Sequence, residues 1–191
     1  MLELVTGGSG SGKSEYAEGL AVKARKRKAG GTLYYIATMC PSDEECLKRI
    51  EKHRRMRAEK GFVTIECYTH LEKVEISGGD VILLECMSNL LANEMFGPQG
   101  RISIERKDSM ESRLKEAILA PLFHLEKQAA HMVVVTNEVF SDGTACEEET
   151  DSYVRLLGKV NCEIGKKADT VTEVVCGIPV RRKGEGLCCI H

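Results

Sequence analysis

The sequence predicts an α/β fold in which a mostly parallel central sheet is flanked by helices. Short runs rich in β-branched residues alternate with longer segments of helical character. The runs are apolar almost throughout, which is typical of strands covered on both faces. A glycine-rich motif joins the first run to the first helical segment. The 191 residues fit one domain and leave little room for a second core.

The elements follow one another in a regular order along the chain. The predicted strands are residues 2–6, 32–38, 81–85, 132–136 and 170–176. The predicted helices are residues 13–28, 42–60, 87–96, 109–130 and 147–168. The first helix ends in a run of cations before two glycines, which is more typical of a solvated helix end than of a binding patch. Residues 97–106 have the composition of a loop.

Composition and charge exclude several classes of protein. Lys and Arg number 27 against 29 Asp and Glu, so the formal net charge of -2 provides no basic field for nucleic acid. The nine cysteines are an odd number without CxxC pairs, which favours a reducing compartment. No apolar run approaches the ~18 residues of a membrane span, and the first residues do not resemble a signal peptide. We therefore expect a cytoplasmic protein with no membrane span and no nucleic-acid partner.

The last residues, 181–191, show no clear periodicity, and we assign them no role. The chain ends in Cys188, Cys189, Ile190 and His191, a pattern that could suggest a metal site. Because no second pair of ligands lies nearby in the sequence, a structural interpretation is favoured.

A phosphate-binding loop is predicted between the first strand and the first helix. The pattern GxxxxGK[ST] is formed by Gly7, Gly8, Ser9, Gly10, Ser11, Gly12, Lys13 and Ser14. Glycines let the backbone turn tightly and direct amide N–H groups at phosphate oxygens, and the following helix adds its positive N-terminal end. Lys13 supplies a cation for the β and γ phosphates, and Ser14 offers a hydroxyl to Mg²⁺. The alternative is a glycine-rich turn that binds nothing.

A magnesium site also needs a carboxylate near the carboxyl end of another strand, because open α/β sheets bind ligands at that edge. Glu85 directly follows four apolar residues and fits this position, although it could also mark the exit of the strand into solvent. Residues 136–138, Thr-Asn-Glu, close the next strand in the same way. For residues 136–138, a role in the site and a simple exit of the strand into solvent both remain open.

The helix predicted at 42–60 places one histidine among several cations. Arg49, His53 and Arg57 have i, i+4 and i+8 spacing and share one helix face. The group could hold a triphosphate; it could also be a solvent-facing amphipathic helix or, with less support from the few aromatics, a nucleic-acid surface. A neutral imidazole can also attack the α-phosphorus of a nucleoside triphosphate, expel pyrophosphate and retain the nucleotide. Neighbouring arginines would keep His53 neutral and stabilise charge on the phosphates.

These motifs together resemble the bifunctional adenosylcobinamide kinase/adenosylcobinamide-phosphate guanylyltransferases of cobalamin biosynthesis, the CobU/CobP type. The resemblance covers nearly the whole chain. It rests on the order and spacing of residues 4–14, 35–38, 49–54, 64–66, 83–86, 135–139, 157–161 and 174–180.

The resemblance implies a RecA-like P-loop NTPase domain over residues 1–191 that assembles as a homo-oligomer, typically a trimer. It implies that ATP or GTP phosphorylates adenosylcobinamide, and that GMP from GTP then passes through a guanylyl-histidine at His53 to adenosylcobinamide phosphate. The implied nucleotide-binding residues outside the loop are Ala37, Thr38, Met39, Arg54, Arg55, Met56, Arg57, Glu66 and Glu85, with Ser14 and Glu85 also at Mg²⁺.

Two segments depart from the family pattern. The family commonly has a proline and a tryptophan after the position of Arg57, whereas this chain has no Trp, and we expect Phe62 to take the aromatic role. Residues 140–144 replace a glycine-rich stretch of the family. Two other functions remain as alternatives: a P-loop kinase without nucleotidyl transfer, and a nucleotide-switched binding protein, which lacks support from any NKxD-type motif.

Overall fold

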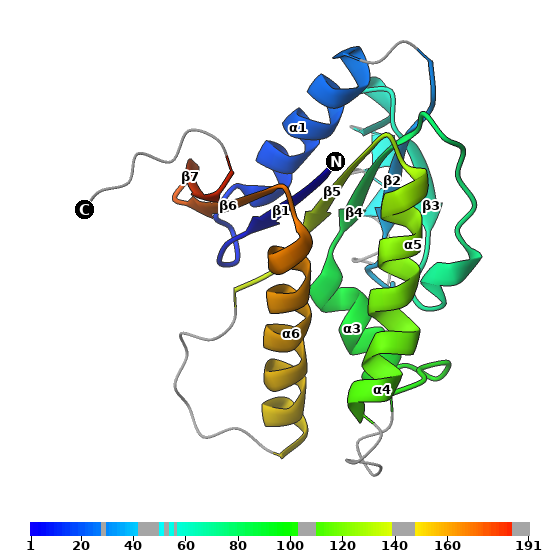
Figure 1. Ribbon diagram of the computed structural model, residues 1–191, viewed down its shortest axis with the longest axis vertical. Helices are drawn as coiled ribbons and strands as arrows, with labels where there is room; N and C mark the ends of the chain where they lie inside the picture. The colour runs from blue at the N-terminus through cyan, green and yellow to red at the C-terminus, as the bar shows by residue number, and fades with distance from the viewer. Residues whose placement is uncertain are drawn as a thin grey trace.

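The computed structural model describes residues 1–27, 30–41, 50–51, 54–55, 57–102, 110–138 and 148–184. Its centre is a seven-stranded sheet with the strand order β3-β2-β4-β5-β1-β6-β7 (Figure 1). All neighbouring strands are parallel except β6 and β7, which form an antiparallel hairpin. The strands are β1 (Leu2–Thr6), β2 (Leu33–Ala37), β3 (Val63–Glu66), β4 (Val81–Glu85), β5 (His131–Val135), β6 (Thr170–Val175) and β7 (Ile178–Lys183).

Helices cover both faces of the sheet. They are α1 (Lys13–Arg27), α3 (Met87–Phe96), α4 (Met110–Leu114), α5 (Ala120–Gln128) and α6 (Glu148–Lys167), with a 3₁₀ turn η1 (Leu71–Lys73) and a π-helical turn η3 (Lys115–Leu119) between α4 and α5. On one face, the small side chains of Ala17, Ala21 and Ala24 let α1 pack closely on β1, β4 and β5. On the other face, α3, α5 and α6 bury leucines against the alternate residues of the same strands.

This architecture confirms the predicted mostly parallel sheet flanked by helices. The five predicted strands all lie in the sheet within one residue of their expected bounds, and α3 begins and ends as expected. The helix predicted at 109–130 consists of α4, η3 and α5 in succession. Of the helix predicted at 42–60, only residues 50–51, 54–55 and 57–60 are described, and those up to residue 59 are helical.

Two edge strands were not expected from the sequence. In β3, the run Val-Thr-Ile-Glu is short and only partly buried, so it lacks the continuous apolar character of the inner strands. In β7, Pro179 and three cations hide the strand pattern. Residues 181–191 were assigned no role, and this interpretation was wrong for residues 181–183, because they form part of β7 and pair with β6. Pro179 is tolerated in β7 because one side of an edge strand needs no hydrogen-bond partner.

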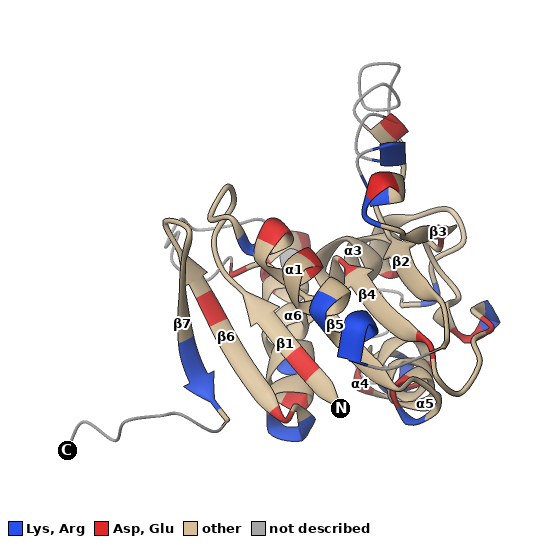
Figure 2. Cartoon of the chain, turned by 90° about the horizontal axis from the view of Figure 1, so that it is seen from above, with Lys and Arg blue, Asp and Glu red and all other residues tan. Residues whose placement is uncertain are grey.

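Charged residues of both signs are spread along the described chain. Figure 2 shows Lys and Arg interspersed with Asp and Glu over the described chain, in agreement with the nearly balanced composition. None of the described helices is both long and apolar enough to cross a membrane.

A buried polar cluster joins three strands near their amino ends. Glu3 on β1 lies 2.7 Å from His131 Nε2 on β5, and it accepts a 2.9 Å hydrogen bond from Thr170 Oγ1 on β6. All three side chains are buried. Burial alone raises the pKa of the Glu3 carboxyl, but its hydrogen bonds to His131 and Thr170 and the nearby charges of His131 and Arg181 outweigh burial, so the net pKa is lower than usual.

Glu3→Gln is expected to lower the free energy of unfolding by about 1–3 kcal/mol at pH 7, because a charged acceptor is removed from a buried network. A lowered folded-state pKa stabilises the protein above the ordinary carboxyl pKa of about 4.3, and this stabilisation is lost as the pH falls through the folded-state value. The difference between wild type and variant should therefore shrink below about pH 4. Urea unfolding at pH 7 and at acidic pH checks this; a constant difference contradicts it.

Candidate active site

The glycine-rich loop runs from the end of β1 into α1 and is held by the β6–β7 hairpin. Gly177 N donates a 2.9 Å hydrogen bond to Ser11 O. A Cβ at Gly7 would lie 2.5 Å from Val174 O, and Gly12 has a φ of +87°, so the loop needs glycine at both positions. Lys13 Nζ donates to Gly8 O at 2.9 Å, which places the buried ammonium group over the loop that precedes it.

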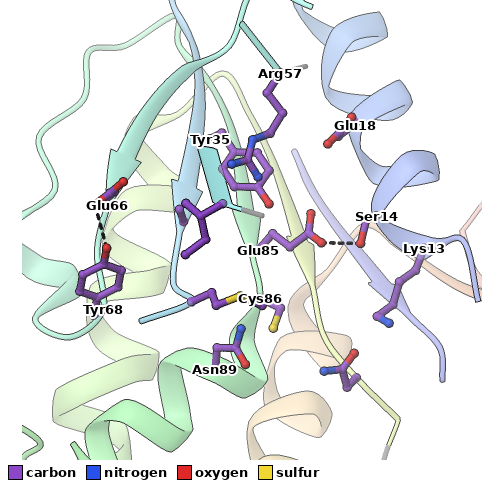
Figure 3. Close-up of a pocket in the computed structure, with 14 residues that line it drawn as sticks. Lys13, Ser14, Glu18, Tyr35, Arg57, Glu66, Tyr68, Glu85, Cys86 and Asn89 are labelled. Carbon is purple, nitrogen blue, oxygen red and sulfur yellow. Dashed lines mark hydrogen bonds between the residues drawn. The ribbon is translucent and has the colours of Figure 1, made fainter. Parts of the chain in front are cut away.

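The residue after Lys13 contacts the end of β4. Ser14 Oγ donates a short hydrogen bond to Glu85 Oε1, and the two residues come from the first turn of α1 and the last position of β4 (Figure 3). The other carboxylate oxygen, Glu85 Oε2, is buried and has no hydrogen-bond partner among the described residues. The prediction that Glu85 faces the loop rather than solvent is in agreement with this geometry.

The Ser14 and Glu85 pair fits a magnesium ion in its chemistry. Mg²⁺ prefers oxygen ligands, and the pair offers a hydroxyl and a carboxylate with one uncommitted buried oxygen. Within the described part of the chain, no group of three or more His, Cys, Asp or Glu residues is placed to hold a metal ion. A magnesium ion here would therefore take its remaining ligands from nucleotide and water, which is common for Mg²⁺.

The far side of the pocket carries a stacked cation. The Arg57 guanidinium lies 3.6 Å from the centroid of the Tyr35 ring, and Arg57 is only 7% exposed. Phe62 is buried and packs edge-on against the same ring with the centroids 6.0 Å apart, while its replacement of the family's aromatic residue stays a prediction. Burial, and next the negative charge of Glu85, raise the pKa of the Tyr35 phenol far above its usual value. Tyr35 is therefore a neutral ring that supports Arg57.

A second group of contacts follows β3. Glu66 accepts a 2.7 Å hydrogen bond from the Tyr68 hydroxyl and forms a close ion pair with Arg54. Figure 3 shows Glu66 and Tyr68 side by side, across the pocket from Lys13 and Ser14. Both partners of the ion pair are partly exposed, so the pair orients Arg54 more than it stabilises the fold.

One cavity of about 350 Å³ lies between these groups. It is lined by Lys13, Ser14, Glu18, Tyr35, Ala37, Met39, Ile50, Arg57, Glu66, Tyr68, Glu85, Cys86, Asn89 and Asn137. Most of the lining residues come from β2, β3, β4 and β5 near their carboxyl ends and from the start of α1, as expected for a parallel sheet. Ile50 and Arg57 come from the helical residues before β3, and Asn89 comes from α3.

The structure brings seven of the eighteen predicted site residues to the lining of this cavity, and residues 7–12 of the loop and Arg54 are not among them. Lys13, Ser14, Ala37, Met39, Arg57, Glu66 and Glu85 line it. Thr38 is instead fully buried beneath it, and exposed Arg55 pairs with Glu51 at 2.5 Å. His53 and Met56 lie outside the described residues, as do residues 140–144 and the Cys188–Cys189 tail.

Several lining residues were not predicted. Among them are Tyr35, Tyr68, Cys86 and Asn89, and none of these belongs to a motif with a mechanism of its own. Of the segment 136–138, whose role was left open, Asn137 lines the cavity and donates a 2.8 Å hydrogen bond to Ser88 Oγ. Two signals in the sequence could have selected Asn137: its position directly after β5, and its place in the segment 135–139 that contributes to the resemblance.

The parallel sheet, the glycine-rich loop after β1 and the cavity at the carboxyl edge define an α/β protein of the P-loop class. Residues 3–182 match the family described as cobinamide kinase/cobinamide phosphate guanyltransferase. The chain therefore belongs to this family, and the resemblance found in the sequence is confirmed.

Named relatives cover the chain almost completely. The bifunctional adenosylcobalamin biosynthesis proteins CobU of Escherichia coli and Salmonella typhimurium are each 34% identical over 189 residues, covering 96% of this chain and all of each relative. CobP of Pseudomonas aeruginosa is 31% identical over 192 residues, covering 98% of this chain and all of that protein. Among solved structures, the flagellar accessory protein FlaH of Methanocaldococcus jannaschii has a TM-score of 0.47 at 15% identity, covering 96% of this chain and 78% of FlaH.

Cys86 provides a test of the geometry of the cavity. Its thiol lines the cavity, lies 3.0 Å from Ser88 Oγ and has a pKa raised by burial, whereas Cys176 is exposed. Since the thiolate is the reactive form, iodoacetamide at pH 7.5 should alkylate Cys86 about tenfold or more slowly than Cys176. Peptide mass spectrometry of the native protein measures both rates. Equal rates would contradict the buried position of Cys86.

Proposed function

We propose that this chain phosphorylates adenosylcobinamide with ATP or GTP, and then transfers GMP from GTP to adenosylcobinamide phosphate to give adenosylcobinamide-GDP. Membership of the family over residues 3–182 supports the proposal. The observation that carries it is a single cavity with Lys13 and Ser14 on one wall and Arg57 and Glu66 on the other. Such a cavity offers cations to a triphosphate at both of its ends.

In the kinase reaction, the hydroxyl oxygen of the aminopropanol group of the corrinoid attacks the γ-phosphorus. A new P–O bond forms, the bond from the γ-phosphorus to the β–γ bridging oxygen breaks, and the nucleoside diphosphate leaves, while the proton of the hydroxyl is released to water. Lys13 and the amide groups of residues 7–14 hold the β and γ phosphates. When bound between Ser14 and Glu85, Mg²⁺ would neutralise phosphate charge.

In the transfer reaction, a neutral imidazole nitrogen of His53 attacks the α-phosphorus of GTP. A P–N bond forms, the bond to the α–β bridging oxygen breaks and pyrophosphate leaves. A phosphate oxygen of adenosylcobinamide phosphate then attacks the same phosphorus, and the P–N bond breaks to return free His53. Arg54 directly follows His53 in the sequence and Arg57 lies four residues beyond it; cations close to the imidazole would disfavour its protonated form and stabilise the charge on the phosphates.

The oligomeric state and the cellular compartment are inferred from the same family and from the composition of the chain. We infer a homo-oligomer, a trimer by the resemblance, that works in the cytoplasm without a nucleic-acid partner. The balanced charge supports the last point, and the free described cysteines Cys40, Cys67, Cys86, Cys162 and Cys176 are consistent with a reducing compartment.

A covalent adduct tests the transfer reaction directly. Incubation with Mg²⁺ and α-labelled GTP without corrinoid should label the protein, because the first half of the reaction needs no acceptor. A phosphoramidate is lost in acid and survives alkali, so the label should show this profile. It should be absent in His53→Ala and present in the matched control His124→Ala, a histidine on α5 away from the cavity. A protein that binds GTP without forming the adduct would be a kinase only.

The two activities should respond differently to two substitutions. Lys13→Ala is expected to lower both activities by about 100-fold or more, because both need the phosphates held by the loop. His53→Ala should abolish GMP transfer and retain a substantial part of the kinase activity, because the corrinoid hydroxyl attacks γ-phosphorus without it. Separate assays with γ-labelled ATP and α-labelled GTP measure the two reactions. GMP transfer by His53→Ala would refute the mechanism.

A further inference from the structure

Asn93 on α3 connects the ends of two strands in one wall of the cavity without lining the cavity itself. Its Nδ2 donates one hydrogen to Thr38 O at 2.8 Å and the other to Tyr68 O at 2.9 Å. Thr38 follows β2 and Tyr68 follows β3, so one half-buried amide fixes the main chain where both strands end. One bond is made to Tyr68, which lines the cavity, and the other to Thr38, which directly precedes the lining residue Met39.

The contacts continue from Tyr68 toward the cations. The Tyr68 hydroxyl donates to Glu66 Oε2 at 2.7 Å, and the other oxygen of Glu66 pairs with Arg54. Arg54 directly follows His53 in the sequence. A chain of contacts therefore runs from Asn93 through Tyr68 and Glu66 to Arg54, on the wall opposite the glycine-rich loop.

The next residue of α3 anchors the same region independently. Glu94 is fully buried and accepts hydrogen bonds from His70 N at 2.9 Å and from the Arg101 guanidinium at 2.6 Å. Arg101 also donates to Ala117 O at 3.0 Å. Because Glu94 and Arg101 hold the loop after Tyr68 to the core, loss of the Asn93 amide would shift the local main chain while the fold persists.

We propose that Asn93 is a positioning residue for the GMP-transfer reaction, acting through Tyr68 and Glu66 on Arg54. The inference rests on the proposed function. Among the described residues, Asn93 has no direct hydrogen bond or ion pair to the loop, Lys13, Ser14 or Glu85. Its link to Glu85 is indirect, because it bonds the carbonyl of Thr38, whereas Glu85 O is held by Thr38 N and Cys86 by Thr38 Oγ1. Its contribution should therefore be larger for GMP transfer than for phosphoryl transfer from ATP, which depends on the loop.

The test compares both activities in one protein preparation. Asn93→Ala removes two hydrogen bonds, and the rate of protein labelling by α-labelled GTP should fall about tenfold. The kinase rate with γ-labelled ATP should fall by about twofold at most. A purely structural role would lower both rates together with the folded fraction, so the ratio of the rates separates the two roles.

A second single variant keeps the test decisive if Asn93→Ala folds poorly, and a double variant adds a further test if it folds. Tyr68→Phe deletes the donor to Glu66 and should lower the same ratio. In the double variant, the two effects should be less than multiplicative, because both substitutions interrupt one chain of contacts. The matched control is Asn161→Ala on α6. Asn161 Oδ1 accepts a 2.8 Å hydrogen bond from Thr136 Oγ1, and its removal should leave the ratio of the GMP-labelling rate to the kinase rate unchanged.

The outcomes distinguish this inference from the proposed function. If the wild-type protein forms no GMP adduct, the proposed function fails. If the wild type forms it and Asn93→Ala or Tyr68→Phe keeps the wild-type ratio of the two rates, only the role of Asn93 is refuted. Multiplicative effects in the double variant would likewise refute action through Tyr68.

Discussion

The cavity depends on a pair of hydrogen bonds that join β2 to β4 beyond their last paired residues. Thr38 Oγ1 donates to Cys86 O at 2.8 Å and accepts from Cys86 N at 2.7 Å, while Thr38 N donates to Glu85 O at 3.1 Å. Because the Thr38 hydroxyl both donates and accepts, it bonds the main-chain carbonyl and N–H of Cys86, neither of which has a partner within the described sheet beyond the end of β4. Glu85 is thereby fixed at the floor of the cavity, facing Ser14.

The cations of the cavity are held by different kinds of partner, and this decides what they can bind. Arg54 is paired with the carboxylate of Glu66, whereas Arg57 is supported by the face of the Tyr35 ring. A ring attracts a guanidinium without using its N–H donors, so Arg57 keeps them for an oxyanion even though it is buried. Arg57 Nε accordingly has no hydrogen-bond partner among the described residues. Burial also strengthens any charge interaction that forms there.

The inner strands and the loop could be predicted because their signals are contiguous in the sequence. Residues 81–85 are apolar up to Glu85, and residues 7–14 carry the whole phosphate-binding pattern. β3 and β7 could not be found in this way, because each is an edge strand with one unpaired side and needs little apolar character. Tyr35 and Asn93 were missed for a related reason. Their roles depend on Arg57 and on two main-chain carbonyls that are remote in sequence.

The arrangement explains how a chain of this size can carry out two phosphorus chemistries. The loop and α1 hold one end of the cavity, are built from consecutive residues and are bonded to the β6–β7 hairpin through Gly177 N and Ser11 O, so we take this wall as common to both proposed reactions. The other wall is assembled from β2, β3 and the residues near Arg57, and α3 fixes it through Asn93. Attack at the γ-phosphorus and attack at the α-phosphorus need nucleophiles at different distances from the loop. A fixed wall and a separately positioned wall meet that geometric requirement within one cavity.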